Sequence, residues 1–430
     1  MKINKKALPP DTEEFLEHPL EDGSLDPASY LTASDLKSDS DEDESNIPTM
    51  SLVIDRNTIE SELDEHIEEL TLKPDKKYKF IRSIGFGGMK AVIQVSDKDT
   101  TRKVAMAIIP DIEDRSPKDI NRFIREARIT ARLEHPNIVP IHDIGIDANG
   151  SPYFTMKYLR GQSLALVLKK LSSGDPDAME KFTLPRLLRT YVKVANAIAF
   201  AHSKQIIHLD LKPENIHLGD FGEVLVLDWG LAKFIGNRDD YNDEFEKDTK
   251  VNYDRETGAF MTLDGVAKGT PGYMAPEQAA GKNQEKDERT DIYALGCILY
   301  AILTFENPLS NRKDVKRMLH DTVVGNIESP SQLKNLQRPI PPRLETICLK
   351  AMNLLPDDRY QSVGELRNDI FAFMSGYATI AENAGQIKKT FLFFTRNWLQ
   401  LLSAATLFIL LALIGLLIFA YRTGRLIIDI

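Results

Sequence analysis

Three short runs in the first third of the chain have the pattern of β-strands, the first with polar residues between apolar ones and the third wholly apolar. They cover residues 78–85, 91–96 and 104–109. Because successive side chains of a strand point to opposite faces, this pattern predicts neighbouring strands of one small sheet. Residues 117–134 repeat apolar residues at helical spacing instead, which predicts an amphipathic helix.

The pattern becomes mainly helical from about residue 164 to residue 378, with glycine and proline between the apolar segments. We therefore expect an α+β fold of two lobes. The smaller lobe, residues 78–156, is rich in strands, and the larger lobe, residues 157–378, is helical.

The C-terminal part contains a long uncharged stretch, residues 398–421, whose clearly polar members are Gln400, Ser403 and Thr406. About 20 apolar residues span a bilayer, so this stretch predicts a single transmembrane helix. We expect a juxtamembrane linker over residues 379–397 and a short tail over residues 422–430. The flanking basic residues are Lys388, Lys389 and Arg396 before the stretch, and Arg422 and Arg425 after it. The stretch indicates a cell-membrane protein that is anchored by its tail. The weak excess of basic residues before the stretch favours an orientation with the two-lobed body in the cytoplasm.

The N-terminal part is acidic and of low periodicity. Residues 1–75 hold 21 acidic and 6 basic side chains, although the whole chain has a net charge of only −10. We expect a disordered acidic tail over residues 1–54, and a short helix and linker over residues 55–77. This helix would either pack on the folded body or act as an autoinhibitory or partner-binding helix. No apolar region follows Met1, so we expect no cleavable signal peptide.

The remaining composition narrows the chemistry. Cys297 and Cys348 each lie in an apolar helical run, which predicts two buried free thiols. Because the chain has only these two cysteines, we expect no structural zinc site. No basic stripe with interleaved aromatic residues occurs, so we expect no nucleic-acid partner.

Three motifs carry the chemistry. Residues 208–215 read HLDLKPEN, residues 228–230 read DWG, and residues 275–277 read APE. In this order and spacing they resemble the catalytic core of a serine/threonine protein kinase of the bacterial, eukaryotic-like type. The resemblance covers residues 78–378 and implies the two-lobed protein kinase fold. It also implies transfer of the ATP γ-phosphoryl group to Ser or Thr hydroxyls of proteins, with Mg²⁺. It leaves a homodimer open.

The resemblance assigns a role to each motif residue. Asp210 would accept the proton of the substrate hydroxyl, and Lys212 would neutralise the transferred phosphoryl group. Thr270 would contact this base and the substrate loop. Asn215 and Asp228 would hold Mg²⁺, because hard divalent ions prefer oxygen ligands.

The expected nucleotide site begins with a glycine-rich loop, whose backbone N–H groups would face the phosphates. Met156 would be the gatekeeper of the adenine pocket. The residues expected to bind ATP are Gly85, Phe86, Gly87, Gly88, Val92, Ala105, Met156, Tyr158 and Leu159.

One departure from the family pattern decides between two functions. Ala107 stands where the third strand should carry the ATP-binding lysine, and Lys90 stands at the third-glycine position of the loop. This loop resembles that of the with-no-lysine kinases, in which a lysine at that position takes over the role. Lys103 is a poor substitute, four strand residues or roughly 13 Å from position 107.

Two hypotheses follow. In an active kinase, the Lys90 ammonium would lie within about 4 Å of Glu126, on the predicted helix. In the alternative, a pseudokinase, Lys90 would project into solvent and the protein would be a nucleotide-binding scaffold without phosphotransfer. The presence of the base and metal residues favours the enzyme.

Two further departures concern control and packing. Leu209 replaces the arginine that usually pairs with a phosphorylated activation loop, and Trp229 replaces a phenylalanine. Three other residues match the family: Asp291, which would brace the catalytic loop, and Glu277 and Arg359, which would form a buried ion pair.

Overall fold

The computed structural model describes residues 77–86, 90–147, 150–235, 261–262, 265–266, 268–312, 314–334 and 336–422. The expected acidic tail and the helix expected within residues 55–77 lie outside the described residues, as do Gly87 and Gly88.

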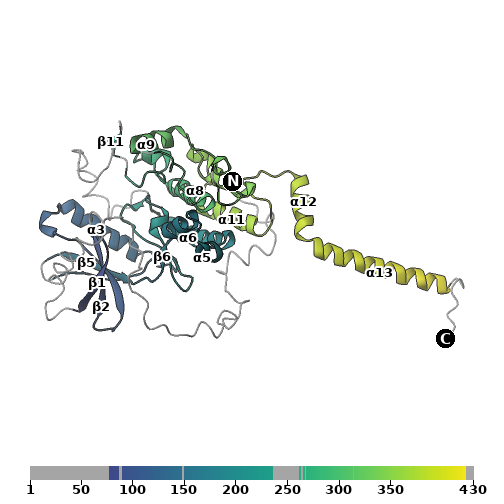
Figure 1. The fold of residues 1–430 in the computed structure, drawn as a ribbon, viewed down its shortest axis with the longest axis horizontal. Coiled ribbons are helices and arrows are strands. Elements are labelled where there is room, and N and C mark those ends of the chain that lie inside the picture. Colours follow the sequence, from purple (N-terminus) through teal and green to yellow (C-terminus); the bar gives the residue numbers. More distant parts are fainter. Residues whose placement is uncertain are drawn as a thin grey trace. The chain divides into compact units, whose positions relative to one another are not determined.

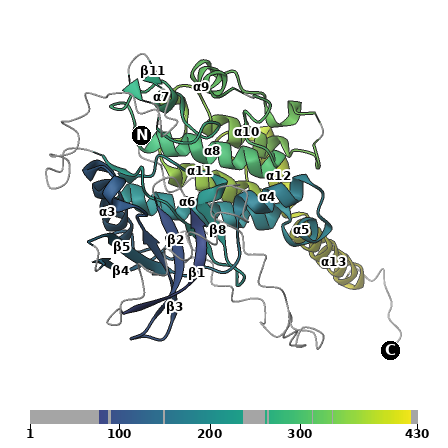
Figure 2. The same cartoon turned by 60° about the vertical axis from the view of Figure 1, so that its left-hand side comes forward.

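The small lobe is a five-stranded antiparallel sheet in the order β1-β2-β3-β5-β4. The three expected strands are present, with ends that differ by one residue from the prediction. The sheet is drawn in purple and blue in Figures 1 and 2. Its strands are β1 (Tyr78–Phe86), β2 (Ala91–Asp97), β3 (Lys103–Ile108), β4 (Ile141–Ile146) and β5 (Pro152–Lys157).

The expected helix of this lobe is α3 (Pro117–Ala131), which ends three residues before the predicted position 134. Ser116 caps its first turn by accepting a hydrogen bond from the backbone N–H of Asp119 at 3.3 Å. Beyond Ala131, the backbone N–H groups of Arg132 and Leu133 donate to carbonyls three residues earlier, at 3.1 and 3.0 Å, so the α-helical pattern of bonds four residues apart ends there.

α3 packs on the sheet through one apolar face. Phe123 and Ala127 contact Ala107 and Phe154 of the sheet in one buried cluster, and the Phe123 and Phe154 rings lie 4.9 Å apart. The same packing buries the neighbouring Glu126, which is 9% exposed.

The large lobe is mainly helical, as expected. Its central helix is α8, in which every residue from Thr290 to Thr304 is buried. Cys297 on α8 and Cys348 on α10 are buried free thiols, as predicted. The helices are α4 (Leu164–Ser172), α5 (Pro176–Lys181), α6 (Leu184–Ser203), α7 (Pro276–Ala279), α8 (Glu288–Thr304), α9 (Val315–Val324), α10 (Pro342–Ala351) and α11 (Val363–Met374).

Short strands of this lobe frame the catalytic loop. β6, β8 and β9 form one three-stranded sheet, and β7 pairs with β10. A further pair joins β11 to β12. Their bounds are β6 (Gln162–Ser163), β7 (Ile206–Ile207), β8 (Ile216–Leu218), β9 (Val224–Val226), β10 (Lys233–Phe234), β11 (Met261–Thr262) and β12 (Gly265–Val266).

Two helices end the described chain: α12 (Gln386–Arg396) and α13 (Trp398–Arg422). By length and composition, α13 is able to cross a membrane, since Trp398–Ala420 has 23 residues and a mean hydropathy of 2.8. The segment expected to be a linker at residues 379–397 therefore contains α12, a helix that the sequence pattern had not predicted.

Candidate active site

A buried carboxylate holds the catalytic loop. The side chain of Asp291, in the first turn of α8, accepts the backbone N–H groups of His208 and Leu209 at 2.8 and 2.9 Å. It also contacts the ring of His202 at 2.8 Å. Burial raises the pKa of Asp291, but the interactions with His202 and His208 lower it below its usual value, so the carboxylate stays ionised.

The loop backbone is strained at Leu209, whose φ of +64° lies in the left-handed region. Two contacts offset this cost. Asp291 accepts from the N–H of Leu209, and the Gln278 amide donates to the Leu209 carbonyl at 2.8 Å. The loop is therefore held in the conformation that presents Asp210, the next residue.

The structure brings the three expected catalytic residues of the large lobe together. The Lys212 ammonium donates to the Thr270 hydroxyl at 2.8 Å and lies 3.1 Å from Oδ2 of Asp210. The Thr270 hydroxyl donates to Oδ1 of Asp210 at 2.8 Å. Asp210 thus has its two oxygens oriented by separate donors, and its carboxylate remains 13% exposed.

The two expected metal ligands lie in the same region. The Asn215 amide nitrogen donates to the carbonyl of Asp210 at 2.9 Å, which leaves the amide oxygen as the available ligand atom. Burial raises the pKa of Asp228, but the positive charge of Lys90 lowers it to about 2. An ionised carboxylate and an amide oxygen form a donor set that fits Mg²⁺.

Lys90 connects the two lobes across this site. It immediately precedes β2, and its ammonium forms ion pairs with Oε1 of Glu126 and, at 3.1 Å, with Oδ1 of Asp228. Burial by itself lowers the pKa of Lys90, but the two carboxylates outweigh burial and raise it above its usual value. Lys90 is therefore protonated. Its side chain is 21% exposed, so it lies inside the site and does not project into solvent.

The strand register explains how a lysine at position 90 reaches this place. Val92 of β2 lies opposite Ala107 of β3, so the two residues share a face of the sheet. Lys90 precedes Val92 by two residues and belongs to the same face. It is a diagonal neighbour of Ala107, at about 7–8 Å, which is within reach of a long side chain. Lys103 begins β3 and is exposed.

Gly230 provides the room for this cluster, and the sequence analysis had not assigned it a role. A Cβ atom at this position would lie 3.1 Å from Oε2 of Glu126 and 3.3 Å from Oδ1 of Asp228. The tripeptide DWG that contains Gly230 was the available signal. Its middle residue, Trp229, is 1% exposed, and its ring lies 4.5 Å from that of His208.

Two of the expected nucleotide-binding residues, Met156 and Leu159, are partly buried where the lobes join. Met156 lies opposite Ala105 in the sheet. Met156 and Leu159 pack against the buried residue Val139 of the small lobe and against Leu225 and Leu227 of the large lobe.

Arg82 is a further residue that the sequence analysis missed. It donates to the hydroxyl of Tyr158 at 2.9 Å and to Gln94 at 2.8 Å. Gly85 and Phe86 end β1, at the entrance to the glycine-rich loop. Arg82 thus ties the strand before this loop to the segment that joins the lobes.

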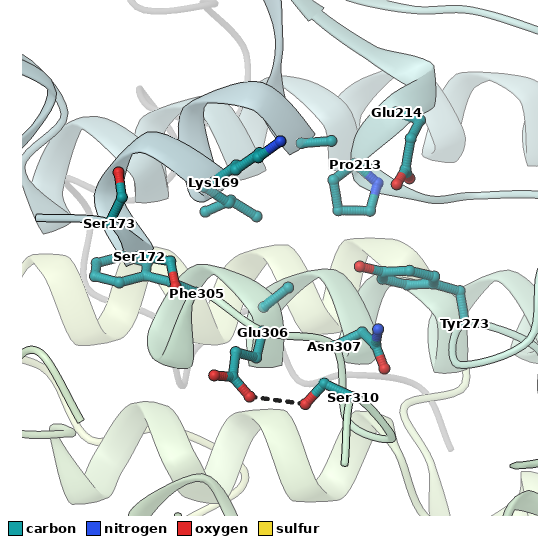
Figure 3. Close-up of a pocket in the computed structure, with 13 residues that line it drawn as sticks. Lys169, Ser172, Ser173, Pro213, Glu214, Tyr273, Phe305, Glu306, Asn307 and Ser310 are labelled. Carbon is teal, nitrogen blue, oxygen red and sulfur yellow. Dashed lines mark hydrogen bonds between the residues drawn. The ribbon is translucent and has the colours of Figure 1, made fainter. Parts of the chain in front are cut away.

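An open cavity of about 450 Å³ lies beside the catalytic loop (Figure 3). Glu214 and Pro213 line it from the loop, and Tyr273 and Glu306 line it from the rest of the lobe. Oε2 of Glu214 is buried and has no hydrogen-bond partner within the described part of the chain. An acceptor without a donor is costly in such a place. Glu214 also contributes an acidic side chain to the lining of the cavity.

Comparison with known proteins identifies the family of the chain. The model of the protein kinase domain matches residues 78–369. The serine/threonine-protein kinase PknD of Chlamydia trachomatis serovar D is 39% identical over 309 residues, which cover 70% of this chain and 32% of that protein. PknD of Chlamydia muridarum is 38% identical over 306 residues, and PknD of Chlamydia pneumoniae is 37% identical over 304 residues. The chain spans about a third of the length of these relatives. The two-lobed fold, the ordered catalytic loop and these similarities show that the chain belongs to the protein kinase family.

Proposed function

We propose that this protein is an active serine/threonine protein kinase, anchored in a membrane by α13, in which Lys90 replaces the missing lysine of β3. The observation that carries the proposal is the double ion pair of Lys90 with Glu126 and Asp228. A solvated loop lysine would have neither partner. The similarity to the PknD proteins supports serine and threonine as the acceptor residues.

Each residue of the site has a separate task in phosphoryl transfer. Asp210 accepts the proton of the substrate hydroxyl, and Lys212 places a positive charge beside the transferred phosphoryl group. Lys90 binds phosphate oxygens of ATP from the side of the small lobe, and Glu126 keeps its ammonium oriented. Asn215 and Asp228 would hold Mg²⁺, which supplies further neutralisation of the phosphates when bound.

The enzyme and the pseudokinase differ in the effect of one substitution. Asp210→Asn is expected to lower phosphotransfer from labelled ATP to a generic basic protein by 10²–10⁴-fold, the usual contribution of general-base catalysis. Nucleotide affinity is expected to stay within about threefold, because Asp210 contacts the substrate hydroxyl and does not contact ATP.

The unsubstituted full-length chain is the reference in this experiment. If it binds nucleotide and transfers no phosphate to itself or to the basic protein, the scaffold hypothesis replaces the enzyme hypothesis.

The cavity beside the catalytic loop supports a more specific substrate proposal. A protein segment that brings its hydroxyl to Asp210 passes Glu214, four residues further along the chain. We expect Glu214→Gln to lower kcat/KM about tenfold, or about 1.4 kcal/mol, for a peptide with an arginine close to the phosphorylated serine. The matched control is the same peptide with alanine in place of that arginine, which should be unaffected. An equal loss with both peptides would mean that Glu214 does not recognise the cationic side chain.

Membrane anchoring rests on the length and composition of α13. In this arrangement the kinase domain faces the cytoplasm, where ATP is available.

A further inference from the structure

α12 carries an apolar stripe that the rest of the described chain does not cover. Ile387, Phe391 and Phe394 are spaced at i, i+4 and i+7, so they lie on one face of the helix. They are 90%, 64% and 54% exposed, respectively. Three large apolar side chains in a row on a helix that is not buried mark a contact with something else.

Two basic residues of α12 outside the stripe contact the kinase domain or its C-terminal extension. The Lys388 ammonium pairs with Glu382 at 2.7 Å, and the Arg396 guanidinium lies 3.7 Å from the centre of the Tyr377 ring. Glu382 is in turn paired with Arg343 of α10 at 2.9 Å. Lys388 lies about 100° and Arg396 about 180° around the helix from Ile387, so the side of α12 that makes these contacts is not the side that carries the stripe.

The position of α12 in the chain indicates what covers the stripe. α12 ends at Arg396, and the apolar helix α13 begins at Trp398. A helix that spans a bilayer has its ends at the level of the lipid headgroups, so α12 must lie close to that level. Aromatic and basic residues are favoured there, and amphipathic helices lie in the plane of this interface with their apolar face in the acyl region.

We propose that α12 lies along the membrane surface, with the Ile387–Phe391–Phe394 stripe inserted among the lipids. The contacts of Lys388 and Arg396 then hold the kinase domain in one orientation relative to the bilayer. This inference rests on the proposed anchoring by α13. It adds that the segment between the domain and the span is a lipid-binding surface.

Tryptophan fluorescence in liposomes tests this orientation with the full-length chain. In a Trp398→Phe background the remaining native tryptophan is Trp229, which is 1% exposed inside the domain. Phe391→Trp then places a probe on the stripe, and Phe393→Trp places a matched probe about 200° around the helix. Phospholipids brominated near the headgroup end of their acyl chains are expected to quench the emission at position 391 at least twofold more strongly than at position 393.

Three outcomes would overturn the proposal. Absence of quenching at both positions would place α12 in water, and equal quenching would show that it has no preferred face toward the lipid. A blue-shifted emission from position 391 without bromine quenching would show that protein, such as a second copy of the chain, covers the stripe. Quenching of Trp398 in the unsubstituted chain reports separately on α13. If Trp398 is not quenched, the anchoring itself fails.

Discussion

Lys90→Ala is expected to lower kcat/KM for phosphotransfer at least a hundredfold, which corresponds to about 2.7 kcal/mol of transition-state stabilisation. The substitution removes the ammonium that pairs with Glu126 and Asp228, and with it the positive charge that the small lobe contributes to the phosphates. It also leaves two carboxylates of like charge close together in a partly buried site. The measurement is steady-state transfer from labelled ATP by the full-length chain.

The controls use the strand register. Lys103→Ala removes an exposed lysine at the start of β3 and should change activity less than twofold. Lys90→Gly combined with Ala107→Lys returns the lysine to β3, on the same face and about 7–8 Å away. This double variant should recover part of the lost activity. If Lys90→Ala retains activity within about threefold of the parent, Lys90 is not the relocated lysine.

Arg359→Ala is expected to destabilise the kinase domain by about 3–5 kcal/mol, the usual cost of removing one partner of a buried ion pair. Arg359 donates two hydrogen bonds to the Glu277 carboxylate, at 3.0 and 2.9 Å, and its own side chain is 0% exposed. Without Arg359 the Glu277 charge stays buried, and among the residues that the structure describes only the Thr290 hydroxyl, at 2.8 Å, remains as a side-chain donor to it. Thermal unfolding of the solubilised chain should show a midpoint lower by on the order of 10 °C.

Asp357→Ala is the matched control for this prediction. Asp357 also forms an ion pair with an arginine, Arg289, but its side chain is 90% exposed. Exposed pairs contribute little, so the change should be below about 1 kcal/mol. Equal shifts for the two variants would show that burial does not determine the contribution of these pairs.

The parts of the site that were predictable from sequence are short segments of chain. Asp210, Lys212 and Asn215 lie within six residues of one another, so one continuous motif indicated their common location. The strands of the small lobe and α3 were predictable for a similar reason, since periodicity within one segment reports which face is buried. The start of α3 was predicted at the correct residue, beside its cap Ser116, but its end and the ends of the strands were less accurate, because periodicity within a segment does not report where the segment stops.

α12 was not predictable in the same way. Its stripe of three apolar residues covers a single face, and the rest of its surface mixes the basic residues Lys388 and Arg396 with the apolar Phe393. The apolar residues have helical spacing, but a segment of 11 residues is too short to form a stable helix by itself, because nucleation of an isolated helix is costly. Contacts with Glu382 and Tyr377, outside the helix, stabilise it in the folded chain.

By itself, the sequence determined the family, the two-lobed fold and the absence of a lysine at position 107 of β3, and it provided the expectation of which residues are catalytic and which bind metal. Only the tertiary structure decided where the ammonium of Lys90 lies. Its partner Asp228 is 138 residues away along the chain, and Glu126 is on a third segment. The register of β2 on β3, the packing of α3 on the sheet and the space left by Gly230 together bring these charges into contact. Such contacts between distant segments arise from packing, which local periodicity and motif spacing do not encode.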